Sequence, residues 1–265
     1  MSGPVSGPVS GPAAAPAAIE VRGLTRRFGG LCAVDSVSIR VEPGARHAVI
    51  GSNGAGKSTL FALIGGAQRP SSGSVYLGGD DVTGLAEHRR AQRGLARTFQ
   101  HANLFGPATV AANVALAVRR WLGCGYRPWP DRRRERAVSD RVAQLLETVG
   151  LTGRAGTPAA SLSHGERRQL EVAVALAAQP SVLLLDEPTA GMAATETRRF
   201  VELVQALPQT LTLVLVEHDL EVVFGLATHL SVLHLGRLLA DGNPEEVRAD
   251  PAVRAAYLDA RSLAS

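Results

Sequence analysis

The chain has 265 residues, of which 45% are hydrophobic and 20% charged, and it carries a formal net charge of +4 at pH 7. That length suffices for one large domain, or for one domain with a small subdomain. No apolar run reaches the ~18 residues of a membrane-spanning helix, and two cysteines provide neither a disulfide framework nor a zinc site. We therefore expect a soluble protein in a reducing cytoplasm, and any membrane role must come through a partner.

The first 18 residues differ in composition from the rest. They read MSGPVSGPVSGPAAAPAA, a run of small residues and proline without the basic start or apolar core of a signal peptide. Such a segment cannot bury enough apolar surface to fold. We expect residues 1–18 to form a disordered tail, residues 19–258 to form the folded domain, and residues 259–265 to form a C-terminal tail.

Strand patterns dominate the first part of the folded chain. The segment RHAVIG is a short apolar strand that runs straight into a glycine-rich loop, and a helix pattern follows that loop. We expect strands over Ile19–Phe28, Ser36–Val41 and Arg46–Gly51, within Pro70–Asp81 and over Leu95–Phe99, and a helix over Lys57–Ile64.

The middle of the chain changes to helix patterns. They cover Thr109–Trp121, Arg134–Val149 and Gly165–Ala178, with a Gly/Pro-rich link at Gly123–Asp131. Because this block interrupts an alternation of strands and helices, it predicts a helical subdomain inserted into the core, over about residues 101–178.

The alternation resumes after the helical block. We expect strands over Val182–Leu185, Leu211–Val216, Leu230–Leu235 and Arg237–Ala240, and helices over Thr195–Leu207, Asp219–Ala227, Asn243–Val247 and Pro251–Leu258. Apolar strands that alternate with helices typically form a parallel sheet covered on both faces. The expected fold class is therefore α/β with a mostly parallel sheet.

The loop GSNGAGKS matches GxxxxGK[ST] and lies between a predicted strand and a predicted helix, which is the context this phosphate-binding motif needs. Its backbone N–H groups and the helix start favour anionic oxygens. Lys57 is the only lysine among 28 basic residues, although arginine serves everywhere else. A phosphate cradle needs the compact ammonium that lysine supplies. The expected nucleotide contacts are Gly51, Ser52, Asn53, Gly54, Ala55, Gly56, Lys57, Ser58 and Thr59.

Two further patterns bear on chemistry. SVLLLDE is an apolar strand that ends in Asp186 and Glu187, and a buried strand rarely ends in two carboxylates without a cation or water to oppose them. Asp186 and the Ser58 hydroxyl would hold Mg²⁺, and Glu187 would act as general base on the attacking water. LSHGE begins a helix at Ser163, which by itself is an ordinary helix start.

Taken in order, the phosphate loop, Gln100, LSHGE, LLLDEP and the pair Glu217-His218 resemble the ATP-binding subunits of ABC transporters. The resemblance spans about Ile19 to Leu258. It implies a P-loop NTPase core, an antiparallel β subdomain and an inserted helical subdomain. It also implies ATP hydrolysis with Mg²⁺ as cofactor by a dimer of two such subunits, identical or different.

The resemblance implies a role for each motif residue. Gln100 would contact Mg²⁺ and water and sense the membrane partner, His218 would contact the γ-phosphate, and Phe28 would stack on adenine. Ser163, His164 and Gly165 would contact the nucleotide bound to the partner subunit. Two departures stand out: His164 replaces a usual glycine, and Ala193 replaces a usual aspartate that couples the two sites.

RRFGGLCAVDSVS, ARTFQHANLF and the C-terminal GRLLADGNPEEVRADPAVRAAYLD resemble the branched-chain amino acid uptake subgroup. LSH with AGM also resembles urea and short-amide importers, so that substrate class remains open. The implied partners are membrane permease subunits at the cytoplasmic face of the membrane and, indirectly, an extracytoplasmic solute-binding protein, with no nucleic acid.

Two other functions remain as alternatives. A soluble ABC protein acting on ribosomes or DNA usually has tandem cassettes or long coiled coils, and neither is present in the sequence. A non-hydrolysing regulator would not need both Glu187 and His218. The basic run Arg132–Arg136 is expected to be a solvated loop or a helix start, with contact to anionic lipid heads as an alternative.

Overall fold

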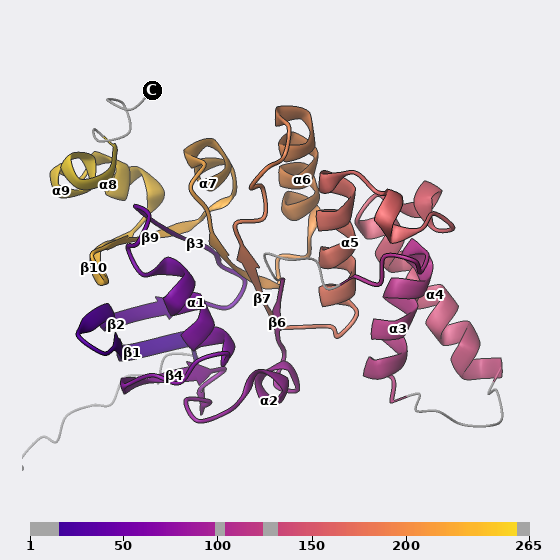
Figure 1. The fold of residues 1–265 in the computed structure, drawn as a ribbon, viewed down its shortest axis with the longest axis horizontal. Helices are drawn as coiled ribbons and strands as arrows, with labels where there is room; N and C mark the ends of the chain where they lie inside the picture. The colour runs from indigo at the N-terminus through magenta and orange to yellow at the C-terminus, as the bar shows by residue number, and fades with distance from the viewer. Residues whose placement is uncertain (1–15, 99–103, 124–131, 259–265) are drawn as a thin grey trace, which may run out of the picture.

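The computed structural model describes residues 16–98, 104–123 and 132–258 (Figure 1). Its strands are β1 (Ile19–Phe28), β2 (Leu31–Val41), β3 (Arg46–Gly51), β4 (Ser72–Leu77), β5 (Asp80–Asp81), β6 (Leu95–Arg97), β7 (Val182–Asp186), β8 (Thr212–Val216), β9 (His229–His234) and β10 (Arg237–Gly242). Its α-helices are α1 (Lys57–Gly65), α2 (Glu87–Ala91), α3 (Val110–Trp121), α4 (Arg132–Thr148), α5 (His164–Leu176), α6 (Ala194–Ala206), α7 (Leu220–Leu226), α8 (Pro244–Ala249) and α9 (Pro251–Val253).

The main sheet has the strand order β10-β9-β3-β8-β7-β6. Strands β9, β3, β8, β7 and β6 run parallel, and β10 pairs antiparallel with β9 at one edge. Every residue of β7 and β8 is buried, because helices and the second sheet cover both faces. This explains the continuous apolar runs VLLL and TLVLV, and it confirms the predicted α/β class with a mostly parallel sheet.

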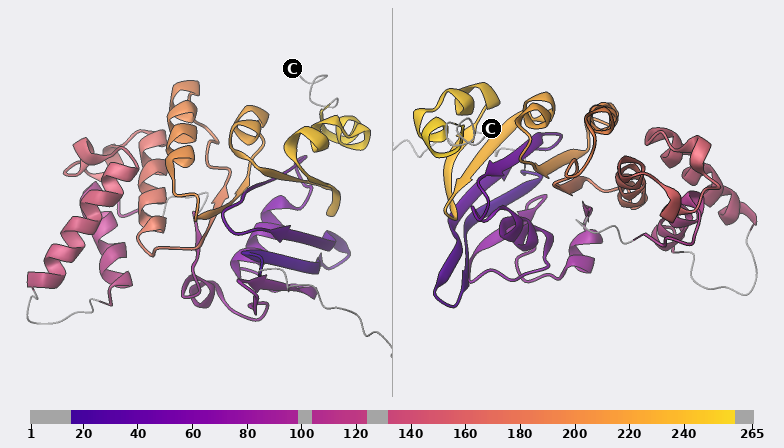
Figure 2. Two further views of the ribbon diagram at one scale, coloured as in Figure 1. Left: turned by 180° about the vertical axis from the view of Figure 1, so that it is seen from behind. Right: turned by 45° about the horizontal axis from the view of Figure 1, so that its top comes forward.

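The second sheet is antiparallel, with the order β2-β1-β4-β5. Its inward residues, among them Ile19 and Leu24, share a core with Phe61 of α1 and with one face of the main sheet. The helices α3, α4 and α5 form the helical part, which lies at the opposite end of the molecule (Figures 1 and 2). Both the antiparallel subdomain and the inserted helical part are therefore present.

Most predicted elements differ from the observed ones by one to three residues at their ends, and β2 begins five residues before the predicted Ser36. The apolar packing also begins before Ile19, since Ala17 is buried and the Ala18 amide donates to the Val41 carbonyl at 2.9 Å. None of the helices in the described ranges is long and apolar enough to cross a membrane.

The short helix α2 has no counterpart among the predicted elements. Its sequence EHRRA reads as solvated surface, yet Arg90 is fully buried. The Arg90 guanidinium donates to the carbonyls of Leu63 and Ile64 at 2.7 and 2.6 Å, near the C-terminal end of α1. A cation is favourable there because the helix dipole is negative at its C-terminus. Burial nevertheless lowers the pKa of Arg90 to about 10.

Candidate functional site

The predicted phosphate loop connects β3 to α1, with Gly56 as the N-cap residue of the helix. Gly56 has a φ of 100°, and a Cβ at this position would collide with the Ala33 carbonyl oxygen. Only glycine combines this left-handed backbone with so close an approach. The backbone can therefore curl around a ligand at the start of α1, which is an anion-binding position.

Lys57 is buried beneath this loop, with 6% of its surface exposed. Its ammonium donates to the backbone carbonyls of Gly51 at 2.7 Å and Ser52 at 3.0 Å. These two bonds hold the only lysine of the chain inside the curve of the loop. The side chain is thus positioned to meet phosphate oxygens as a compact point charge.

The loop forms one wall of a pocket of about 340 Å³. Opposite walls come from the end of β1, the start of β2 and the residue after β7. The lining residues are Phe28, Leu31, Ala33, Asn53, Gly54, Ala55, Gly56, Lys57, Ser58, Thr59 and Glu187. The Phe28 ring is 41% exposed and the Arg26 guanidinium lies 4.6 Å from its centroid, so one face of an apolar platform borders the pocket.

Asp186 ends β7 and is almost completely buried. Its Oδ2 accepts a bond of 2.8 Å from Nη2 of Arg97, at the end of the neighbouring strand β6. Its Oδ1 has no hydrogen-bond partner within the described part of the chain. A buried carboxylate oxygen without a partner is costly, so this atom favours an added cation or water. None of the sequence motifs described above assigns a role to Arg97.

Glu187 follows with a φ of 42°, a left-handed conformation that is uncommon for a residue with a side chain. Its amide donates to the Val216 carbonyl at 2.9 Å, which fixes the backbone between β7 and β8. Strained conformations of this kind cluster at functional sites. Glu187 lines the phosphate-loop pocket.

Glu217, at the end of β8, organises the loop after Glu187. Its buried carboxylate accepts from the amide and hydroxyl of Thr189 at 2.9 and 2.7 Å, and from the His218 amide at 3.0 Å. The His218 side chain remains 47% exposed, with Nδ1 3.7 Å from Glu217. His218 is thus held by its backbone on the same edge of the sheet as Asp186, and its ring is accessible. Gln100 lies outside the described residues.

The LSHGE segment starts α5 as a complete capping box. The Ser163 hydroxyl accepts from the Glu166 amide, and the Glu166 carboxylate accepts from the Ser163 amide. The second acceptor at this helix start is Glu196 of α6, which accepts from the Ser163 hydroxyl at 2.9 Å and from the Gly165 amide at 3.3 Å. The Ser163 hydrogen bond lowers the pKa of Glu196.

His164 points away from this helix start. Its Nε2 lies 2.9 Å from the Ala190 carbonyl oxygen, so the ring is tied to the loop after Glu187. Ser163 and Gly165 line a separate small hollow with Glu196 and do not border the phosphate-loop pocket. Within one chain, the structure brings together Phe28, the loop and Glu187, and leaves Ser163, His164 and Gly165 apart from them.

Two family models match the chain. The ABC transporter model matches residues 34–190, and a model described as branched-chain amino acid ATP-binding cassette transporter matches residues 237–258. The first match spans the phosphate loop, the helical part, α5 and the Asp186-Glu187 pair. The second spans β10, α8 and α9.

Curated relatives match over nearly their whole length. The high-affinity branched-chain amino acid transport ATP-binding protein BraF of Pseudomonas aeruginosa is 39% identical over 91% of this chain and 97% of its own. LivG of Escherichia coli, described in the same words, is 38% identical over the same shares. The methionine import ATP-binding protein MetN of Myxococcus xanthus is 38% identical over 89% of this chain and 71% of its own.

Solved structures agree with the fold. An ATP-binding cassette of an ABC transporter in its ADP conformation is 29% identical, with a TM-score of 0.79 over 91% of this chain and 98% of that chain. A nucleotide-free ATP-binding cassette is 28% identical, with a TM-score of 0.77 over the same shares.

Proposed function

The chain belongs to the ABC transporter family as an ATP-hydrolysing subunit, and from that premise we propose that it energises uptake of branched-chain amino acids. The observation that carries the substrate class is the match of residues 237–258 to the branched-chain amino acid cassette model. Overall sequence identity does not distinguish a branched-chain amino acid importer from a methionine importer, because the methionine importer subunit is 38% identical as well. The C-terminal segment does distinguish them, since residues 237–258 match the branched-chain amino acid model.

The nucleotide in this proposal is ATP, held in the pocket between Phe28 and the phosphate loop. Phe28 stacks on adenine, the loop amides surround the phosphates, and Lys57 bridges β- and γ-phosphate oxygens. The buried Lys57 position and the pocket of about 340 Å³ support this assignment. Further contacts with the phosphates come from the backbone or side chains of Ser52, Asn53, Ala55 and Thr59.

The residues present fit a magnesium ion. Asp186 offers a buried carboxylate oxygen that has no partner among the described residues, and Ser58 lies at the start of α1 beside the pocket. When bound, Mg²⁺ neutralises charge on the β- and γ-phosphates. Asp186 and Ser58 are its proposed ligands, with Gln100 as a third. Arg97 binds Oδ2 of Asp186 in the described structure, so a cation held by Asp186 would share this carboxylate with Arg97.

Glu187 is the proposed general base. Glu187 borders the pocket, and its carboxylate would take a proton from the attacking water while His218 helps to position it. The left-handed backbone at Glu187, tied to Val216, fixes the backbone position from which this side chain extends. Glu217 serves as a positioning residue, because it holds both Thr189 and the His218 amide.

The second half of each site comes from a partner subunit in this proposal. The Ser163 hydroxyl and the Gly165 amide, at the start of α5, can donate hydrogen bonds to an anion. In the described chain they donate to the Glu196 carboxylate. A γ-phosphate bound to the partner's loop would replace Glu196 on the same donors. His164, bonded to Ala190, then links this contact to the loop that follows Glu187.

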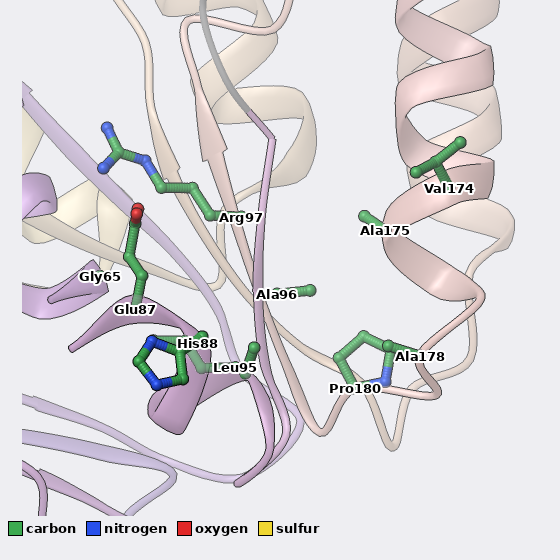
Figure 3. A pocket seen from close by; sticks show the side chains of 11 residues that line it. Gly65, Glu87, His88, Leu95, Ala96, Arg97, Val174, Ala175, Ala178 and Pro180 are labelled. Carbon is green, nitrogen blue, oxygen red and sulfur yellow. The ribbon is translucent and has the colours of Figure 1, made fainter. Parts of the chain in front are cut away.

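A membrane permease segment is the proposed occupant of a second pocket of about 370 Å³ (Figure 3). The pocket lies between α2, β6 and α5, at the seam of the nucleotide core and the helical part. Its lining includes the apolar residues Leu95, Ala96 and Val174 and the charged residues Glu87 and Arg97. Because Arg97 also binds Asp186, an occupant here would act on the active site. A solute-binding protein completes the importer, and the subunit sits at the cytoplasmic face of the membrane.

Uptake measurements test the proposal. A deletion strain would be complemented with the wild type or with Glu187→Gln, and uptake of labelled leucine, methionine and urea would be compared. We expect the wild type alone to restore leucine uptake and neither gene to alter uptake of the other two. Restored urea uptake without restored leucine uptake would favour the short-amide alternative. Leucine uptake equal in both strains would contradict the hydrolytic role of Glu187.

A further inference from the structure

Two histidines, a serine and an aspartate form a grid on three neighbouring strands of the main sheet, away from the nucleotide pocket. His47 of β3 and His229 of β9 are register partners, and Ser231 of β9 and Asp241 of β10 are register partners. Since His229 and Ser231 are two residues apart, their side chains share one face of β9. Backbone pairing therefore fixes the four side chains side by side.

The distances within this grid are close to those of a metal site. His229 Nε2 lies 3.2 Å and His47 Nε2 lies 4.0 Å from Oδ1 of Asp241. All three ligand atoms lie within 4.8 Å of one another. Bond lengths of about 2.0–2.2 Å to a tetrahedral zinc ion place neighbouring ligand atoms about 3.4 Å apart. A small inward movement of the side chains would satisfy this geometry.

The present contacts leave the ligand atom of His229 available, and that of His47 becomes available after a change of tautomer. His229 Nε2 is buried but makes no hydrogen bond within the described residues, because its orientation toward Asp241 is unfavourable. His47 Nε2 contacts the Ser231 hydroxyl at 2.7 Å, and that hydroxyl donates to Asp241 at 2.5 Å. His47 is 1% exposed, and burial lowers its pKa to about 4, so the ring is neutral near pH 7. Because the Ser231 proton is donated to Asp241, Nε2 of His47 carries the ring proton in the described arrangement and donates to the Ser231 hydroxyl, and Nδ1 has no partner within the described residues. A shift of this proton to Nδ1 frees the Nε2 lone pair for a metal ion.

We propose that His47, His229 and Asp241 bind a divalent transition metal of the zinc class. Two imidazoles and one carboxylate form a donor set that suits Zn²⁺ and suits Mg²⁺ or Ca²⁺ poorly. Water or the Ser231 hydroxyl completes four-coordination. The ion joins β10 to β9 and β3, and thereby fastens the segment that begins with β10 to the nucleotide core. Its role is structural.

The test uses the full chain, stripped of metal with a chelator and then saturated with Mg·ADP so that the nucleotide site is occupied. Zinc is added, excess is removed, and bound zinc per chain is measured. Cobalt absorption reports the coordination geometry. The variants are His229→Gln and Asp241→Asn, which avoid the fully buried His47. The matched control is His88→Gln, an exposed histidine on α2. Unchanged ADP affinity confirms that each variant is folded.

We expect one zinc per wild-type chain, a tetrahedral cobalt spectrum, and a rise in Tm of about 5 °C or more at ~100-fold excess of metal over Kd. Both variants should weaken zinc binding by at least ~100-fold, since even outer partners of ligands contribute ~10–100-fold. His88→Gln should behave as the wild type. Wild-type protein that retains no zinc, or variants that retain as much as the wild type, would overturn the proposal.

Discussion

Replacing Arg97 with glutamine removes the cation that faces Asp186. The pair is 2.8 Å long, with side chains 15% and 3% exposed, so the variant leaves a buried carboxylate without its partner. Breaking a buried pair costs about 3–5 kcal/mol, and the partial exposure of Arg97 places the expected loss near the lower end, at about 3 kcal/mol. For a chain of this size, that corresponds to a Tm lower by about 6–12 °C.

The loss should depend on nucleotide. If Mg²⁺ occupies the other side of Asp186, the bound cation replaces the missing charge, and the Tm difference from wild type should shrink by more than half with Mg·AMP-PNP. By linkage, recovery of about 1.5 kcal/mol appears as roughly tenfold tighter nucleotide binding by the variant. Thermal unfolding with and without Mg·AMP-PNP, together with titration of the nucleotide, measures both quantities.

The matched control is Arg119→Gln, which breaks an exposed pair with Glu135 whose side chains are 47% and 44% exposed. An exposed pair contributes about 0.5 kcal/mol, so Tm should change by about 2 °C or less in either state. Equal Tm losses for Arg97→Gln with and without Mg·AMP-PNP would refute the link between Arg97 and the cation site.

Four further predictions concern the site and the stability of the fold. Lys57→Arg should lose most ATP affinity in a fluorescence titration, because the cradle accommodates an ammonium and not a planar guanidinium; wild-type affinity would contradict this. In a Glu187→Gln background, Glu196→Gln should allow ATP-driven dimerisation at lower nucleotide concentration in sedimentation experiments, since the competing charge is removed; an unchanged or higher concentration would refute the competition. Ala193→Asp should cap α6, which has no side-chain cap, adding ~1 kcal/mol in urea unfolding, and should change the Hill coefficient for ATP more than the affinity; an unchanged Hill coefficient counts against it. In chelator, the free energy of unfolding should fall by on the order of 3 kcal/mol as pH drops from 6.5 to about 4, because unfolded His47 takes up a proton that the folded state refuses, and His47→Gln should flatten this slope.

The sequence indicated the main sheet well because its strands are short, apolar and bounded by turns. It did not indicate α2, because a charged five-residue segment resembles a surface loop. Only the fold shows that Arg90 of that segment ends beneath the carbonyls of α1. Local patterns carry no information about carbonyls that lie 26 and 27 residues away in the chain.

The same limit applies to the site. Short motifs contain Lys57, Asp186 and Glu187, so the residues next to them in the sequence are enough to predict their role. Arg97 and Glu196 act through partners 89 and 33 residues away. An arginine within the predicted strand Leu95–Phe99 is a usable signal for Arg97, since the carboxyl ends of adjacent parallel strands meet. No local signal pointed to Glu196.

Arg90 has a mechanical consequence for the nucleotide pocket. Helix α1 is about 13 Å long and begins at the phosphate loop. Its last turn contains the carbonyls that accept hydrogen bonds from Arg90 of α2. Breaking these hydrogen bonds would leave a buried guanidinium without acceptors, so we expect α1 and α2 to move together as one rigid unit. Residues of α2 line the pocket between α2, β6 and α5, and Lys57 stands at the opposite end of this pair of helices, at the start of α1. Tilting α2 therefore tilts the phosphate loop.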